Sequence, residues 1–390
     1  MKKNPLTRLS LLLFGFIIVY FTFTGITTSP WETDSLAYHL PIASNILKLN
    51  FLNIDYQHNP LLLYPGAAEI ILAIFQYFCL ALNLFNVLAL ICLFFSCYYL
   101  AKSITLPKGF SIIFAVTSCL LPTGIRILTT QKIDLWLVIF FINALTTLIN
   151  QPKNIKDYLF LGINLGLLIG CKYSGVLFAS LLIIFYWQNM IRGIKFAYFS
   201  ALLLPLLVFG GSWYLRNYYL TGYPLYLAQN LNNYQLYKII ISQSHLLNNL
   251  FLVSVSELLL WSLSILVTPL YLVFKNDFKE ALQIKKMIIL ALFCLLICFL
   301  LPANPQDLYQ WFRFTICGYI LLILSSFKLA ELYGREKIIS HFAIFNQIAI
   351  LSLLRYRPKI IVGYSTFILS AFFIHLIANK IVKAKPIKEK

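Results

Sequence analysis

Long apolar runs separated by short polar segments recur along almost the whole chain. A membrane-spanning helix needs about 20 mostly apolar residues, with a range of about 17–25. The first run covers residues 9–26. Further runs of about this length follow at 84–101, 109–125, 133–149, 157–171, 173–190, 195–213, 250–274, 287–302, 312–328, 338–354 and 360–380. The pattern predicts an all-α polytopic membrane protein with about twelve transmembrane helices, forming a single domain over residues 1–390.

Two connections are long enough to hold structure of their own, at 29–83 and 214–249. Within the first, Ser35 to Leu49 places apolar residues at helical spacing, as in a helix lying on a membrane surface. The apolar stretch 66–82 is expected to lie at the interface too. An even number of spans then leaves the basic tail 381–390 on the same side as the N-terminus.

Composition excludes most other protein classes. Hydrophobic residues make up 60% of the chain and charged residues 11%, whereas soluble domains are about 45–50% apolar and about 25% charged. A soluble enzyme, a disordered protein, a coiled coil and a nucleic-acid-binding module are excluded, although the net charge is +18. The eight cysteines all lie in apolar runs without a CxxC pair, so we expect free thiols.

The basic residues are distributed unequally between the predicted loops. With twelve spans, 21 of the 31 Lys and Arg fall on the side of the termini, as the positive-inside rule requires of the cytosolic side. The prediction is therefore a plasma (inner) membrane protein with both termini cytosolic and the long loops facing the periplasm or exterior. Arg355, Arg357 and Lys359 fit this pattern poorly, which makes the last two spans the least secure.

Candidate chemistry begins just after the first span, where Glu32 and Asp34 lie two residues apart. A carboxylate at the bilayer edge can act as a general base on a hydroxyl or bind a divalent cation. Asp34 is equally well placed to cap the helix that follows it. Spacing alone leaves these roles open.

Two further acids lie in apolar surroundings. Asp134 opens the fourth span, where an acid is costly unless it faces an aqueous cavity or a partner. Lys132 is the simplest such partner. Glu69 lies in the interfacial stretch and raises the same question.

Several cations lie at the outer ends of spans, where the positive-inside rule disfavours them. They are Arg126, Lys172, Arg216 and Arg313. Such cations can bind a lipid phosphate. The alternative is that each extends separately to the headgroups.

Together these segments resemble the bacterial membrane glycosyltransferases of the C superfamily (GT-C), relatives of the protein O-mannosyltransferases and aminoarabinose transferase. The resemblance covers roughly residues 1–330. It rests on the order of five motifs: Trp31-x-x-Asp34-Ser35-Leu36-x-Tyr38-His39-Leu40-Pro41, Tyr64-Pro65-Gly66-x-x-Glu69, Gln131-x-x-Asp134, Gly170-x-Lys172-Tyr173-Ser174 and Trp213-Tyr214-Leu215-Arg216-Asn217-Tyr218-Tyr219-Leu220-Thr221-Gly222-Tyr223-Pro224-Leu225-Tyr226.

The resemblance implies an inverting glycosyltransferase that uses a polyprenyl-phosphate sugar donor and a glycolipid, polysaccharide or protein acceptor. Asp34 would be the catalytic base, and Asp134 would help hold acceptor or metal. Substrate binding would fall to Glu32, Tyr38, His39, Glu69, Lys172, Tyr173, Arg216, Asn217 and Arg313.

One departure from the family pattern affects the expectation of a metal. Where relatives carry D-x-D or D-E, this chain has Glu32-Thr33-Asp34, so a divalent cation (Mg²⁺ or Mn²⁺) held by Asp34 is an open expectation.

The alternative functions are a carrier or flippase for a lipid-linked saccharide and a non-catalytic assembly subunit. A carrier needs its charged site near mid-membrane, whereas these charges lie at the outer ends of spans.

Overall fold

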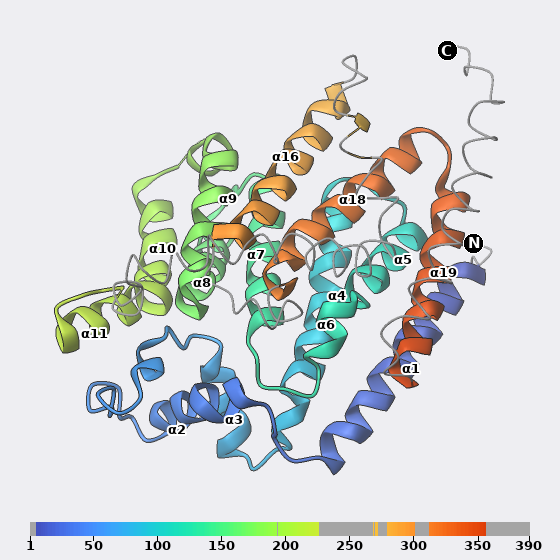
Figure 1. The fold of residues 1–390 in the computed structure, drawn as a ribbon. Helices are drawn as coiled ribbons and strands as arrows, with labels where there is room; N and C mark the ends of the chain where they lie inside the picture. The colour runs from blue at the N-terminus through green and yellow to red at the C-terminus, as the bar shows by residue number, and fades with distance from the viewer. Residues whose placement is uncertain are drawn as a thin grey trace, which may run out of the picture.

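A computed structural model describes residues 5–192, 194–225, 279–300 and 312–355, together with residues 268, 270 and 271. Every regular element in these ranges is a helix, and Figure 1 shows them as a bundle. The predicted spans 250–274 and 360–380, most of the loop 214–249 and the tail 381–390 lie outside the described residues, apart from the residues just named.

The long helices of the bundle follow the apolar runs. They are α1 (Pro5–Thr27), α4 (Phe85–Ser103), α7 (Asp134–Ile149), α8 (Ile155–Cys171), α9 (Tyr173–Ile191), α16 (Lys279–Leu300), α18 (Ile316–Leu332) and α19 (Glu336–Arg355). Among the described residues, five helical stretches are long and apolar enough to cross a membrane: Pro5–Thr27, Leu82–Ser103, Tyr173–Ile191, Phe196–Thr221 and Arg313–Leu332. The protein is thus a helical, multi-pass membrane protein.

Two of the predicted spans have clearly different boundaries in the structure. The run 109–125 is broken into α5 (Lys108–Cys119) and α6 (Pro122–Arg126), because Pro122 forces the residue before it into an extended conformation. The run 195–213 continues beyond its predicted end through α10 (Phe196–Leu206), η4 (Leu207–Gly211) and α11 (Ser212–Thr221). The second long connection therefore begins near residue 222 and not at 214.

The first long loop is folded, as the helical spacing predicted. It contains η1 (Ser35–His39), α2 (Leu40–Leu47), η2 (Pro60–Leu63), α3 (Glu69–Tyr77) and η3 (Leu82–Leu84). Helices α2 and α3 pack on each other and lie across the lower end of the bundle in Figure 1. At 1.5 Å per residue, the nine residues of α3 reach about 13 Å, less than half of a bilayer core. Residues 66–82 accordingly hold no spanning helix.

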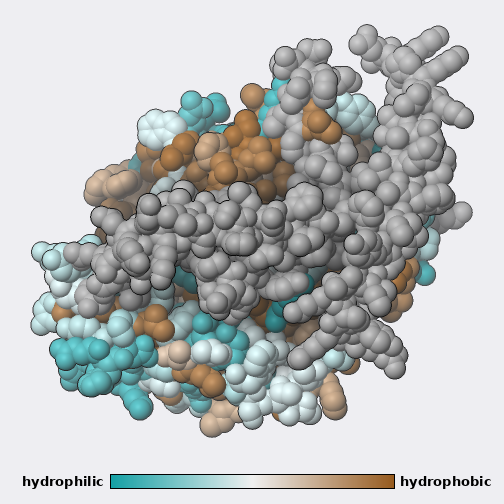
Figure 2. Space-filling view, in the orientation of Figure 1, coloured by the Kyte–Doolittle hydropathy of each residue, from teal (hydrophilic) through white to brown (hydrophobic). Residues whose placement is uncertain are grey.

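The surface reflects this division between bundle and loop. In Figure 2, brown apolar residues cover the upper helices, while polar residues gather at the lower end, where Figure 1 places the first loop. The cysteines whose side chains are described are free thiols, and most are buried among the helices.

Glycine allows α8 to lie against α10 and η4 almost without side chains between them. A Cβ added at Gly166 would lie 2.7 Å from the carbonyl oxygen of Pro205, and one at Gly170 would meet the carbonyl of Phe209. This close approach carries α11 to the lower end of the bundle, beside the first loop.

Candidate active site

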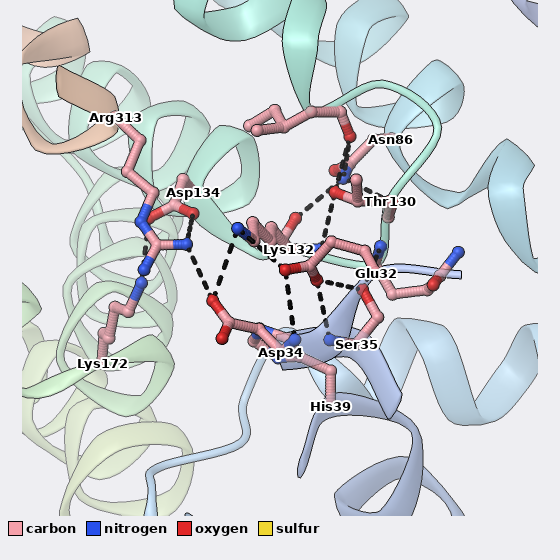
Figure 3. Close-up of polar contacts among 12 residues, drawn as sticks. Glu32, Asp34, Ser35, His39, Asn86, Thr130, Lys132, Asp134, Lys172 and Arg313 are labelled. Carbon is pink, nitrogen blue, oxygen red and sulfur yellow. Dashed lines mark hydrogen bonds and ion pairs between the residues drawn. The ribbon is translucent and has the colours of Figure 1, made fainter. Parts of the chain in front are cut away.

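Four segments that are far apart in the sequence meet at the lower end of the bundle. They are the stretch after α1, the loop before α7, the turn between α8 and α9, and η5 (Phe312–Thr315) before α18. They bring together three acids and three cations, which we call the charged cluster: Glu32, Asp34, Lys132, Asp134, Lys172 and Arg313. Figure 3 shows these side chains pointing toward one another.

Asp34 is the most accessible acid of the cluster. Its side chain is 28% exposed, compared with 9% for Glu32 and 4% for Asp134. One of its oxygens, Oδ2, lies 3.2 Å from Arg313 Nη1 and 3.4 Å from Lys132 Nζ. Burial by itself would raise the pKa of Asp34, but the charges of Lys132 and Arg313 outweigh it and hold the pKa below its usual value. Asp34 is therefore an ionised carboxylate that is accessible to solvent.

Glu32, and not Asp34, caps the helix that begins at Ser35. The Glu32 carboxylate accepts hydrogen bonds from the backbone N–H of Asp34 (3.1 Å) and from the N–H and hydroxyl of Ser35 (both 2.8 Å). Asp34 makes no side-chain capping hydrogen bond. The sequence left the cap and a chemical role for Asp34 equally open, and the geometry gives the cap to its neighbour.

Asp134 lies deeper, at the first residue of α7, where the helix dipole favours a negative charge. Its Oδ1 accepts a hydrogen bond from Lys172 Nζ at 3.0 Å, and its Oδ2 lies 3.7 Å from Arg313 Nη1. The pairing of Asp134 with Lys132 that the sequence suggested is wrong. The Lys132 ammonium lies 3.0 Å from Glu32 Oε1 and pairs with the first-loop acids.

Arg313 links the two halves of the cluster, since it faces both Asp34 and Asp134. Its Nε and Asp134 Oδ2 are buried without a hydrogen-bond partner. The ring of Phe314 lies beside two of the cations, 4.8 Å from Lys172 Nζ and 5.2 Å from Arg313. The cluster thus retains hydrogen-bonding capacity, which an incoming polar group could use.

Asn86 is a site residue that the sequence analysis missed. From the start of α4 its side-chain amide donates to the carbonyls of Ile127, Thr130 and Lys132, at 2.8–3.1 Å. It is fully buried. Asn86 thereby fixes the loop that carries Lys132. The only sequence signal was an amide in an otherwise apolar helix.

His39 and Glu69 form a separate pair beneath the cluster. His39 Nδ1 lies 2.7 Å from Glu69 Oε1, and both side chains are buried. The ring of Tyr38 packs between His39 and Tyr64, with centroids 4.1 and 5.3 Å away. Burial and then the charge of Asp34 raise the pKa of Tyr38 well above its ordinary value, so its hydroxyl stays protonated.

Arg216 and Asn217 lie in a different network, which we call the loop anchor. Arg216 Nη2 donates to the carbonyls of Leu62 (3.2 Å) and Tyr64 (3.3 Å). Asn217 donates to the carbonyl of Leu63 (2.8 Å) and to the hydroxyl of Tyr173 (3.1 Å). In the described part of the chain, no ion pair joins Arg216 to the charged cluster. Two of the predicted outer cations, Lys172 and Arg313, belong to the charged cluster.

The residues around Asp34 do not form a donor set for a resident metal. Within the described ranges, no three His, Cys, Asp or Glu side chains are grouped closely enough to hold a metal ion. The nearest charged neighbours of Asp34 are two cations, Arg313 and Lys132.

The arrangement thus offers an accessible ionised carboxylate beside three cations, at one end of a helix bundle. Comparison with protein-family models, curated proteins and solved structures found no match for this chain.

Proposed function

We propose that this protein is an inverting glycosyltransferase that moves a sugar from a polyprenyl-phosphate donor to a hydroxyl acceptor at the outer face of the plasma membrane. The observation that carries the proposal is the charged cluster itself. It combines one accessible carboxylate, Asp34, with cations from three other segments. Base and phosphate-binding groups are what this reaction requires.

In the proposed reaction, the acceptor oxygen forms a bond to the anomeric carbon as the bond from that carbon to the donor phosphate breaks. The acceptor proton passes to Asp34. The electrons of the broken bond remain on the polyprenyl phosphate, which gains a negative charge. Arg313 and Lys172 stabilise this charge in a poorly hydrated site. Because attack and departure occur on opposite sides of the carbon, the configuration is inverted.

The cations also explain how a carboxylate with a lowered pKa can accept a proton. In the described structure, Arg313 and Lys132 stabilise the ionised form of Asp34. A donor phosphate that binds Arg313 competes with Asp34 for the same guanidinium, and a carboxylate that loses a cationic partner becomes more basic. Donor binding would thus activate the base.

The proposed function includes an orientation of the protein in the membrane. Asn86, Asp134 and Arg313 mark the site ends of α4, α7 and α18. Basic residues lie near or beyond the opposite ends of these helices: Lys102, Lys153, Lys156, Lys328, Arg335 and Lys337. The positive-inside rule assigns that basic end to the cytosol. With about twelve spans, both termini are then cytosolic and the charged cluster faces outward.

The acceptor is a hydroxyl of a glycolipid, polysaccharide or protein. The test is to incubate purified protein with polyprenyl-phosphate sugars and candidate acceptors, and to identify products by mass spectrometry. The proposal expects a glycosylated acceptor together with free polyprenyl phosphate. Intact donor in every reaction, combined with transfer of lipid-linked sugar across a vesicle bilayer, would instead identify a carrier.

A further inference from the structure

Lys132 is the cation of the cluster that has no contact with the donor phosphate in the proposed reaction. Its side chain is only 5% exposed. Its ammonium lies between two acids of the same short segment, 3.0 Å from Glu32 Oε1 and 3.4 Å from Asp34 Oδ2. It therefore binds both carboxylates of the first loop at the site.

The surrounding structure holds this ammonium in one place. Asn86 binds the backbone carbonyl of Lys132 and of two earlier loop residues. The backbone N–H of Gln131 donates to the hydroxyl of Ser35 (3.0 Å), which itself donates to Glu32. The loop with the ammonium and the helix start with the acids are thus fixed to each other.

We propose that Lys132 is a built-in counter-ion that occupies the place a divalent cation would take between Glu32 and Asp34. Two carboxylates that converge on one point invite such a cation, and here a tethered ammonium meets both. The inference rests on the proposed function for its consequence in catalysis, where Lys132 is a positioning residue. It orients Asp34 and keeps Glu32 on the helix start without touching the acceptor or donor.

A lysine in this position removes the need for a metal. The wild-type enzyme needs no divalent cation, so a chelator leaves its turnover unchanged. Lys132→Ala removes the ammonium and opens space between the two acids, which creates a weak metal site. We expect kcat to fall about tenfold or more, because Asp34 loses the ammonium that orients it, and a misplacement of about 1 Å at a catalytic group can cost about a hundredfold in rate. The apparent KM for the donor stays close to wild type.

The decisive kinetic comparison uses Mn²⁺ and three variants. Millimolar Mn²⁺ should restore part of the turnover of Lys132→Ala, and Lys132→Arg should retain most of it without metal. The double variant with Asp34→Asn should not respond, because one of the two acids is gone. Loss of wild-type turnover with chelator, or a Lys132→Ala enzyme with normal kcat, would overturn the proposal.

A second arm needs no substrate and separates this inference from the proposed function. The thermal midpoint of Lys132→Ala should rise with Mn²⁺, whereas that of the wild type and of the double variant should not. If Lys132→Ala does not fold, the same comparison with Lys132→Gln decides. An equal response in wild type and variant, or none in either, would overturn the counter-ion role even if sugar transfer is demonstrated.

Discussion

Two polar networks lie at the same end of the bundle, and each contains an arginine whose side chain is largely withdrawn from solvent. Arg313, in the charged cluster, faces the carboxylates of Asp34 and Asp134. Arg216, in the loop anchor, donates to the carbonyls of Leu62 and Tyr64 and also stacks on Trp213, 4.9 Å from its ring. Carboxylates bind Arg313, whereas backbone carbonyls bind Arg216.

The difference indicates what each network can do. A guanidinium paired with carboxylates can exchange one anion for another, such as a phosphate, at little electrostatic cost. A guanidinium bound to backbone carbonyls can leave them only by exposing buried acceptors, which costs about 1–3 kcal/mol each. We therefore interpret the charged cluster as the reactive region and the loop anchor as the scaffold that holds the first loop over it.

The change expected to have the largest effect is Asp34→Asn. Asn cannot accept the acceptor proton, so turnover should fall by about a hundredfold or more, the usual contribution of a general base. The thermal midpoint at neutral pH should fall only slightly, since the helix cap is supplied by Glu32 and the mutation removes only the ion pairs of Asp34. Product formation at saturating donor and a thermal-shift assay in detergent measure the two quantities.

Near-normal turnover of Asp34→Asn would place the base elsewhere and remove the main contrast between the two networks. Glu32→Gln is the matched control. It alters the neighbouring carboxylate that caps the helix, and we expect it to lower the thermal midpoint more than Asp34→Asn does.

The next effect concerns the donor. Arg313→Gln leaves Asp34 paired with Lys132 and Asp134 paired with Lys172, so no buried acid loses its last cation. Loss of one charge-assisted phosphate contact costs about 1.5–3 kcal/mol, roughly a tenfold or greater loss of donor affinity. Arg335→Gln, beyond the other end of α18, should leave the apparent donor affinity unchanged. Equal donor affinity in both variants would argue against phosphate binding at Arg313.

The loop anchor should show the opposite pattern. Asn217→Ala removes the hydrogen bonds to the Leu63 carbonyl and the Tyr173 hydroxyl. It should lower the free energy of unfolding by about 1–3 kcal/mol, with donor affinity close to wild type for the enzyme that remains folded. Denaturation and donor titration check the two halves. A tenfold loss of donor affinity at full stability would move Asn217 into the reactive region.

The smallest effect is a difference in acid sensitivity. Asp34 and Glu32 have pKa values lowered on folding, by cationic partners that outweigh burial. Their contribution to stability is complete above the unfolded pKa of about 4 and is lost as pH falls through the folded pKa. Asp34→Asn should therefore flatten the fall of the thermal midpoint below about pH 5. Asn217→Ala should lower the midpoint equally across that range, and a parallel fall in all three proteins would contradict the distinction.

The sequence predicted the helical membrane class and the folded first loop well, because apolar runs and helical spacing depend on local composition. It also identified Asp34, Asp134, Lys172 and Arg313 as candidates, since charges at span ends are costly and conspicuous. It could not predict pairings. Lys132 was assigned to Asp134 by proximity in sequence, whereas the loop before α7 turns it toward Glu32.

The remaining errors have similar causes. Arg216 resembled the other outer cations because its partners are backbone carbonyls, which leave no mark in the sequence. Asn86 was overlooked because its role depends on a loop about forty residues away, at Ile127 to Lys132. The predicted helix boundaries were wrong at Pro122, and also after residue 213, where the helical stretch continues to Thr221.

The most direct test of the account follows the anomeric carbon of an isotopically labelled polyprenyl-phosphate sugar by NMR, with wild type and Asp34→Asn side by side. The account predicts that wild type converts the donor signal into that of a glycoside with inverted configuration, while the donor signal persists with Asp34→Asn at the same protein concentration. Conversion at equal rates by both proteins, or a product of retained configuration, would contradict the assignment of the charged cluster as an inverting transfer site with Asp34 as its base.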